Sequence, residues 1–381
     1  ERYDSTGNRI TYLYDSLGNL LAQTAYDTTT AETITVSYTY DANSNCTSAT
    51  DAAGNRTEYT YDALGRKIAE TFHPAEGTAT PKTTQWEYDA DGHNTLLRDY
   101  LGNETRTEYD SLGRVKTQYD ALGNQTVSYR YDDCDRQVSS MDALGYETTY
   151  TYDADGNVIS TTAPNGAVTG NTYDYAGRLT SKTDPKGNRT IYTYDGRGRL
   201  TAVTNALGET HTYTYDNADR QTAQTDPAGR GILYTYNVRG DLATRSYIGE
   251  ATRETYTYTA NGKPKEKISR DGTATTYSYD GFGRLVLEQA GEDRKTYTYD
   301  KVGNCLTETD HGTATTRTYD GEGRVTSKTV EGIGTTTYTY DLNPYNWEVS
   351  ERATATDATV TLTWYDRAGR IQSVESGNGI Y

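Results

Sequence analysis

The phrase Tyr-x-Tyr-Asp-x-x-Gly-Arg recurs along the whole 381-residue chain, and this repetition constrains the fold more than any other feature. The second tyrosine of the phrase occurs seventeen times, and most successive copies lie 20 to 22 residues apart. Only three intervals are longer, at 26, 27 and 25 residues. A fixed period of this length is the signature of a repeat protein, in which each unit packs mainly against its neighbours. We therefore predict one continuous array of seventeen repeats over residues 1–381.

Each repeat is expected to form a β-hairpin. Tyrosine and threonine alternate with period two in segments such as Tyr213-Thr214-Tyr215, and both residue types favour strands. Glycine, aspartate and asparagine separate these segments and mark turns. Two strands of about six residues and two turns of about four account for roughly 20 residues, the length of one unit. No segment shows a helical period of 3.6 residues, so the sequence predicts an all-β protein.

The turn within the hairpin can be predicted in detail from residues 195–199, which read Asp-Gly-Arg-Gly-Arg. Three loop residues that end in glycine suit a type I turn followed by a left-handed residue. Asp195 fits the first turn position and Gly198 the left-handed one. Three repeats lack this glycine, and we expect the residues that replace it to adopt positive φ as well: Ser44, Asp135 and Asp219.

This turn sets the register of the hairpin. It places Tyr194 opposite Leu200 and Tyr192 opposite Ala202. A bulky ring beside a smaller partner, repeated in many units, predicts one packed face built mainly from tyrosine. The Asp–Arg pair of the turn, present in nine units, is expected to form an ion pair on the opposite face.

Composition alone would suggest a disordered chain. Leu, Ile, Val and Phe together make up about 13% of the residues, and the net charge is −17. The 38 tyrosines argue against disorder because they fall in phase with the repeat. A single thin sheet with both faces partly exposed to water would need few aliphatic residues to fold, which explains their low number.

Several functional classes are disfavoured by the same residues. The 54 acidic residues against 37 basic ones argue against nucleic acid as a partner, since phosphate binding requires a basic surface. No apolar run approaches 18 residues, so no membrane span is predicted. The three cysteines have no metal or redox spacing, and Cys46 and Cys305 take the position of Leu200 in their repeats, as small core residues.

The phrase from Tyr192 to Arg199 resembles the YD repeat of the RHS family, which includes shell proteins of bacterial polymorphic toxins and insecticidal toxin complexes, and the teneurins. The resemblance covers essentially the whole chain. It implies that the hairpins form one long curved sheet, a spiral or open segment of a hollow shell. It also implies a secreted or cell-surface protein whose partners are a C-terminal toxin or effector, or neighbouring domains of the same polypeptide.

Two kinds of motif could suggest chemistry within the array. Residues 184–187 and 226–229 resemble the D-P-x-G motif near the self-cleaving aspartyl site of RHS proteins, but they occupy ordinary turn positions. Residues 89–92 and 153–156 have calcium-like Asp-x-Asp-Gly spacing without the remainder of an EF-hand loop. The four histidines are scattered. We interpret both motifs as turns, and we predict no catalytic, cofactor-binding or metal-binding residue.

The best candidates for a specific contact lie where the period breaks. Residues 71–86 end in Trp86, and residues 341–364 are predicted to be an irregular insertion or junction near the C-terminus. Terminal repeats are usually atypical, so both segments fit loops or capping elements. The alternative is a contact surface for a neighbouring domain or a glycan, because tryptophan and tyrosine rings are amphipathic. The residues predicted for this surface are Trp86, Tyr345, Trp347 and Trp364.

The first functional hypothesis is a non-catalytic structural segment of a shell that encapsulates or presents a C-terminal effector. The second is a surface adhesion or carbohydrate-binding array, in which tyrosines on many repeats give avidity. An enzyme is the least favoured of the three because no unique polar cluster interrupts the repetition. The residues predicted to be structural are Tyr192, Tyr194, Asp195, Gly198, Arg199 and Leu200.

Overall fold

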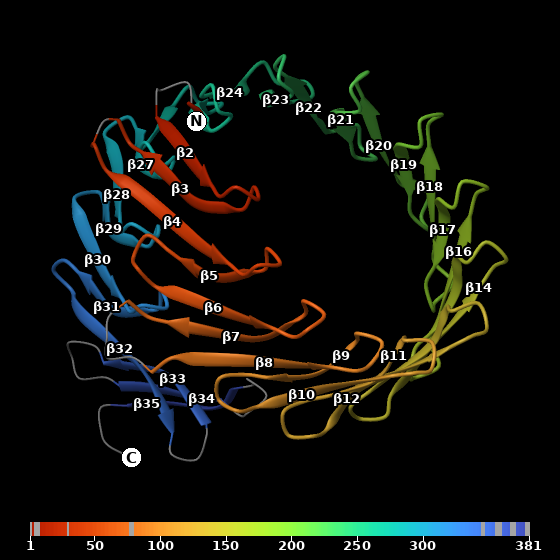
Figure 1. The fold of residues 1–381 in the computed structure, drawn as a ribbon. Coiled ribbons are helices and arrows are strands. Elements are labelled where there is room, and N and C mark those ends of the chain that lie inside the picture. The colour runs from red at the N-terminus through yellow and green to blue at the C-terminus, as the bar shows by residue number, and fades with distance from the viewer. Residues whose placement is uncertain are drawn as a thin grey trace. The chain divides into compact units, whose positions relative to one another are not determined.

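The computed structural model describes the backbone of residues 2–3, 8–28, 30–75, 80–343, 347–354, 360–365 and 371–377 (Figure 1). These residues form β-strands joined by turns, and none of them lies in a helix. The prediction of an all-β protein built from consecutive hairpins is confirmed. Within this part of the chain there is accordingly no helix long and apolar enough to cross a membrane.

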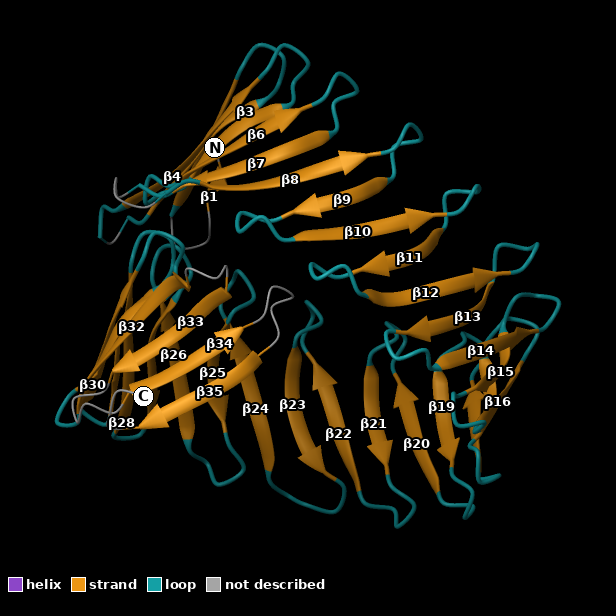
Figure 2. Cartoon of the chain, turned by 90° about the horizontal axis from the view of Figure 1, so that it is seen from below, coloured by secondary structure: helices purple, strands orange, loops and turns teal. Residues whose placement is uncertain are grey.

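Contacts between residues divide the chain into two compact units. The first unit consists of Glu1–Thr107, Asp120–Gly123 and Thr275–Tyr381, so it combines segments from both ends of the chain. The second unit consists of Glu108–Tyr119 and Asn124–Ala274. In both units the strands follow one another as antiparallel hairpins, with turns at both strand ends (Figure 2).

The strands of the first unit come in two series. The N-terminal series is β1 (Arg2–Tyr3), β2 (Arg9–Tyr14), β3 (Leu20–Tyr26), β4 (Thr33–Tyr40), β5 (Cys46–Thr50), β6 (Arg56–Tyr61), β7 (Lys67–His73), β8 (Lys82–Tyr88), β9 (Asn94–Arg98) and β10 (Glu104–Tyr109). The C-terminal series is β26 (Ala274–Tyr279), β27 (Leu285–Ala290), β28 (Asp293–Tyr299), β29 (Cys305–Asp310), β30 (Thr313–Tyr319), β31 (Val325–Val330), β32 (Gly334–Asn343), β33 (Trp347–Thr354), β34 (Val360–Tyr365) and β35 (Ile371–Gly377).

The second unit is a single series of strands, each antiparallel to the next. They are β11 (Val115–Tyr119), β12 (Gln125–Tyr131), β13 (Gln137–Asp142), β14 (Glu147–Tyr152), β15 (Val158–Thr162), β16 (Val168–Tyr173), β17 (Leu179–Thr183), β18 (Arg189–Tyr194), β19 (Leu200–Thr204), β20 (Thr210–Tyr215), β21 (Gln221–Thr225), β22 (Gly231–Tyr236), β23 (Leu242–Tyr247), β24 (Arg253–Tyr258) and β25 (Pro264–Ile268).

The turn of residues 195–199 has the predicted geometry. The Asp195 N–H donates to the Arg199 carbonyl at 3.0 Å, and the Gly198 N–H donates to the Asp195 carbonyl at 3.0 Å. Gly198 has a φ of +85°, in the left-handed region that glycine adopts without steric cost. The residues that replace this glycine in other repeats also have positive φ, as predicted: Ser44, Asp135 and Asp219.

Replacing Gly198 with valine is expected to lower the free energy of unfolding by about 1–3 kcal/mol, because a β-branched residue resists positive φ. A Cβ atom there would also lie 3.4 Å from Nη1 of Arg178. The matched control is Gly196→Val in the same turn, where a Cβ atom meets nothing within 4 Å and φ is not positive. Urea denaturation measures both variants, and unchanged stability of the Gly198 variant would remove the turn assignment.

The strand register departs from the prediction two residues beyond the turn. Tyr194 lies opposite Leu200, as predicted, but Tyr192 lies opposite Val203 and not opposite Ala202. The register shifts at a β-bulge, which places an extra residue in the return strand. The predicted Tyr192–Ala202 pairing is therefore wrong, because it assumed an unbroken two-residue period after the turn. Ala202 instead lies opposite the threonine between the two tyrosines.

Several small residues at the Ala202 position are buried on the threonine side of the sheet: Ser48, Ser139 and Ser181. One repeat earlier, the Thr172 hydroxyl lies 2.9 Å from the Thr180 hydroxyl and 2.7 Å from the Ser181 hydroxyl. Ser181 is only 2% exposed, whereas Leu96 is the one buried hydrophobic side chain among those the structure describes. Hydroxyl clusters and half-buried tyrosines therefore stabilise the sheet in place of a thick hydrophobic core.

Longer strands occupy much of the segment 341–364. Strands β32 and β33 have 10 and 8 residues and pair antiparallel with a register shift. These lengths account for part of the wider tyrosine spacing there. The role of this segment as a junction stays a prediction.

Candidate functional site

In most repeats that the structure describes, the second tyrosine links its hairpin to the preceding one. The Tyr215 hydroxyl donates to the Leu200 carbonyl at 2.8 Å, across the boundary between two hairpins. The Tyr194 hydroxyl makes the same bond to the Leu179 carbonyl at 2.8 Å. The bond recurs in both units: Tyr40, Tyr61, Tyr88, Tyr131, Tyr152, Tyr173, Tyr236, Tyr258, Tyr299, Tyr319 and Tyr340.

The arginine of the turn completes this link from the other hairpin. Arg199 Nε donates to Asp195 Oδ2 at 2.7 Å, and its Nη1 donates to the Asp216 carbonyl of the next hairpin at 2.8 Å. Its guanidinium lies 4.8 Å from the centre of the Tyr215 ring, within the range of a cation–π contact. Seven other arginines cover the tyrosine of the next repeat in this way: Arg66, Arg114, Arg136, Arg178, Arg220, Arg284 and Arg324.

The predicted placement of the Asp–Arg pair on the face opposite the tyrosines is therefore wrong. Asp195 does hold Arg199, but the arginine side chain extends over the ring of Tyr215 in the next repeat. The prediction considered one hairpin alone, in which strict alternation separates the two faces. A long side chain at the strand end reaches its neighbour instead. We call this set of bonds the inter-hairpin contact.

Replacing Tyr215 with phenylalanine is expected to cost about 1 kcal/mol of stability, because the Leu200 carbonyl loses a half-buried hydrogen bond while the ring remains. Tyr192→Phe is the control, since its hydroxyl lies outside the inter-hairpin contact. Thermal unfolding should separate the two variants. Equal midpoints would show that the tyrosine hydroxyl contributes nothing.

Acid should weaken the inter-hairpin contact. A hydrogen bond from the Arg199 side chain, followed by one from the Arg199 backbone N–H, holds the pKa of Asp195 below its ordinary 3.8. The pKa values of Asp132 and Asp174 are lowered in the same way. A lowered pKa in the folded state means that this stabilisation is present above pH 3.8 and is lost as pH falls through the folded value. Unfolding midpoints measured from pH 6 down to about pH 2 should fall steeply below pH 4, and a flat profile would contradict this prediction.

A second set of contacts, which we call the seam, joins the two strand series of the first unit. Asp27 follows β3 and is 2% exposed. Its Oδ2 accepts the N–H of Gly281, which lies 254 residues away in the turn between β26 and β27, at 2.9 Å. A Cβ atom on Gly281 would lie 2.3 Å from Asp27 Cγ, so no other residue fits without a shift.

The seam continues at the hairpin turns two hairpins further along each of the two strand series. Gly321, in the turn between β30 and β31, would place a Cβ atom 2.9 Å from Cβ of Pro74 and 3.3 Å from Oδ1 of Asn55. Lys82 at the start of β8 forms an ion pair with Glu322 at 2.6 Å. Gly281 and Gly321 do not have positive φ, so close packing explains them where the backbone does not.

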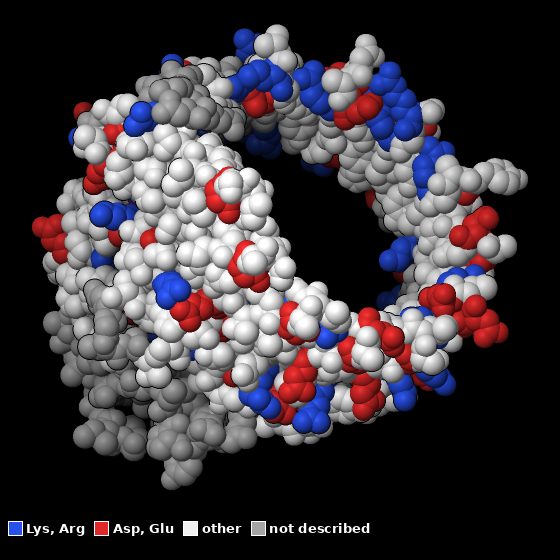
Figure 3. Space-filling model, viewed as in Figure 1, with Lys and Arg blue, Asp and Glu red and all other residues white. Residues whose placement is uncertain are grey.

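Charged side chains are unevenly spread over the surface. On the face shown in Figure 3, the strands β4 to β8 present mostly uncharged atoms, and acidic and basic side chains gather toward the turns. This distribution agrees with the ion pairs, many of which link the two ends of a turn.

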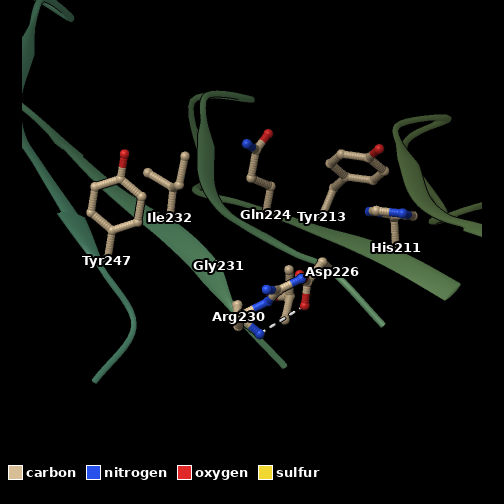
Figure 4. A pocket seen from close by; sticks show the side chains of 9 residues that line it. His211, Tyr213, Gln224, Asp226, Arg230, Gly231, Ile232 and Tyr247 are labelled. Carbon is tan, nitrogen blue, oxygen red and sulfur yellow. Dashed lines mark hydrogen bonds and ion pairs between the residues drawn. The ribbon is translucent and has the colours of Figure 1, made fainter. Parts of the chain in front are cut away.

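The second unit contains a groove of about 530 Å³ across strands β20 to β23 (Figure 4). His211 and Tyr213 of β20, Gln224 of β21, and Ile232 and Tyr247 of β22 and β23 stand along it. The rim carries an ion pair between Asp226 and Arg230, at 2.7 Å. The groove could not be predicted from the sequence, because His211 belongs to no motif. The available signal was Gly231, a glycine at the start of a strand.

The motifs that resembled sites prove to be turns. The Asp226 N–H donates to the Arg230 carbonyl at 2.7 Å, and Gly229 has a φ of +78°. Asp89, Asp91 and His93 place ligand-type atoms within 4.8 Å of one another. However, Asp89 Oδ1 accepts the N–H groups of Asp91 and His93 at 3.0 and 2.8 Å, so this carboxylate is used within the turn. The interpretation of both motifs as turns is confirmed.

The predicted contact surface is not assembled by the described residues. Trp86 lies on β8 opposite Leu97, with Nζ of Lys67 4.4 Å from its ring centre. Tyr345 and the side chains of Trp347 and Trp364 lie outside the described residues. The surface stays a prediction.

Comparison with known families gives two matches that cover different parts of the chain. The RHS Repeat model matches residues 173–210, 197–230, 258–296 and 299–332. The Teneurin YD-shell model matches residues 4–155. No curated protein sequence matches the chain.

Several solved structures share the fold. The crystal structure of TcdB2-TccC3-TEV is 16% identical, with a TM-score of 0.62 over 97% of this chain and 23% of that chain. The Tc holotoxin pore of Photorhabdus luminescens is 16% identical, with a TM-score of 0.60 over 96% of this chain and 23% of that one. TcdB2-TccC3 is 15% identical, with a TM-score of 0.60 over 97% and 25%. The chain thus spans about a quarter of the length of these structures.

The repeat phrase, the hairpin fold and the two family models agree. The chain belongs to the RHS/YD-repeat family.

Proposed function

We propose that the chain is a non-catalytic structural segment of a shell wall, which encapsulates or presents a C-terminal toxin or effector domain of a secreted or cell-surface protein. The observation that carries the proposal is the seam. The seam joins the strand ends of two series through residues that are 254 positions apart in the sequence. A wall wound from one long strip of hairpins requires contacts of this kind between successive windings of the strip. The structural similarity to Tc toxin components supports the same role.

Five of the six residues predicted to be structural have contacts that suit a wall; Tyr192 lies outside them. Tyr194 and Arg199 each bond to a neighbouring hairpin, and the Leu200 carbonyl accepts the bond from the next one. Gly198 and Asp195 shape the turn that presents Arg199. We propose that they act by joining repeats, with no part in catalysis.

The test is protection of a cargo. An unfolded reporter that carries trypsin sites is fused after Tyr381, and its cleavage rate is compared with that of the free reporter. We expect cleavage to slow by at least about tenfold, since only the exposed fraction is cut. Gly281→Leu should abolish the protection by opening the seam, while Gly196→Leu should retain it. A reporter cleaved at the free rate in the unaltered chain would overturn encapsulation.

A further inference from the structure

The groove in the second unit interrupts the repetition of the array. Strand register places Tyr213 opposite Gln224, Gln224 opposite Ile232, and Ile232 opposite Tyr247. These four side chains therefore form one straight row across four strands, which Figure 4 shows standing on the same side of the sheet. At about 4.8 Å per strand the row is roughly 14 Å long. In the preceding repeat, the position of Gln224 is occupied by Val203, opposite Tyr192.

Gly231 allows a close approach of two strands beside this row. A Cβ atom there would lie 2.3 Å from the Gln224 carbonyl oxygen and 2.9 Å from Cδ1 of Ile248, so β22 approaches β21 more closely than a side chain allows. The Ile248 N–H donates to the Gly231 carbonyl at 2.9 Å and holds the strand in this position. The strand spacing beside the groove therefore depends on the absence of a side chain at residue 231.

Two of the lining side chains are held in place by neighbours outside the groove. The Gln221 amide donates to the Gln224 side-chain oxygen at 3.2 Å, which orients the Gln224 amide. The guanidinium groups of Arg245 and Arg270 lie 5.4 and 4.6 Å from the centre of the Tyr247 ring. Preorganised side chains lower the entropic cost of binding a ligand.

The chemistry of the lining defines the class of ligand. Two phenol rings, an imidazole and an amide accompany a single aliphatic side chain, Ile232. The charges at the rim, Asp226 and Arg230, are paired with each other. The two arginines beside Tyr247 are also paired, Arg245 with Glu254 and Arg270 with Glu250, so the groove offers little net charge to an anion. A neutral ligand with apolar faces and many hydroxyl groups matches this mixture, and a volume of 530 Å³ lies in the range of small-molecule sites.

We propose that this groove binds a neutral saccharide of one or two sugar rings. A C–H face of the sugar packs on the ring of Tyr213, and its hydroxyl groups hydrogen-bond to the Gln224 amide and the His211 ring. An extended peptide is a poorer match, because β21 and β22 are already paired on both sides and offer no free edge for strand addition.

The experiment is saturation-transfer NMR and titration calorimetry on the 381-residue chain. The probes are a panel of neutral monosaccharides and disaccharides, an uncharged tyrosine-containing tetrapeptide and inorganic phosphate. We expect at least one saccharide to bind and the other two probes to fail. Tyr213→Ala and Gln224→Val should each weaken saccharide binding by about tenfold. Gln224→Val installs the residue of the preceding repeat, and Tyr192→Ala is the matched control that should bind normally.

Thermal unfolding of each variant separates lost binding from lost folding. If Tyr213→Ala unfolds early, Gln224→Val still decides the outcome because it leaves the strand pairing intact. The proposal is overturned if no saccharide binds, if only the peptide or phosphate binds, or if binding survives both groove variants. Equal loss in Tyr192→Ala would also overturn it, since binding would then be a property of every repeat.

Discussion

Replacing Gly281 with alanine is expected to lower the free energy of unfolding by about 2–4 kcal/mol. The added Cβ would lie 2.3 Å from Asp27 Cγ, in a contact where the carboxylate is 2% exposed. The turn must move away, and the buried carboxylate then loses the Gly281 N–H. Urea denaturation gives the change in free energy, and hydrogen exchange should show faster exchange in β3 and β27.

The matched control for this prediction is Gly196→Ala. Gly196 also follows the aspartate of a turn, but a Cβ atom there meets nothing within 4 Å. Its effect should stay within about 0.5 kcal/mol. Equal effects of the two substitutions would contradict the seam. In addition, Asp27→Ala and Gly281→Ala should combine non-additively, because both act on one contact.

Replacing Gly231 with alanine is expected to be as costly, at about 2–4 kcal/mol, for a different reason. The nearest backbone atoms are the Gln224 carbonyl oxygen at 2.3 Å and Cα of Thr225 at 3.1 Å. Both belong to the backbone of the neighbouring strand, so relief requires β21 and β22 to separate. Thermal unfolding should show a lower midpoint.

Gly170→Ala is the control for this substitution. Gly170 also lies within a strand, β16, and its nearest neighbours would be 4.0 Å from an added Cβ. Alanine there should be neutral or slightly stabilising, because glycine weakens a strand interior. A similar loss in both variants would mean that strand glycine is needed in general and that the close approach at Gly231 is unimportant.

The hairpin architecture was predictable because its signals are local. Turn residues such as Asp195 and Gly198 lie within five positions of each other, and each repeat states the same pattern again. The pairing of Tyr192 was not predictable, since alternation alone does not reveal the bulge that moves Val203 into register. The position of Arg199 over Tyr215 depends on two hairpins together, which a single repeat cannot show.

The seam and the groove could not be derived from local pattern at all. Gly196 and Gly281 have the same local setting, Asp-Gly at the start of a turn, yet only Gly281 meets a distant segment. Gly231 differs from other strand-start residues, but its significance depends on how Gln224 and Ile248 approach it in space. Contacts between segments far apart in sequence are therefore where the structure adds most.

The seam also fixes the number of repeats between the two segments that it joins. Asp27 meets a glycine only because a fixed number of hairpins separates it from residue 281. Deleting one hairpin from this interval would bring the next turn, residues 300–304, to Asp27, with Lys301 where Gly281 now sits. A lysine does not fit where even a Cβ atom comes within 2.3 Å. Evolution can thus vary the surface of each repeat freely, whereas gaining or losing a single repeat requires compensating change along the whole edge.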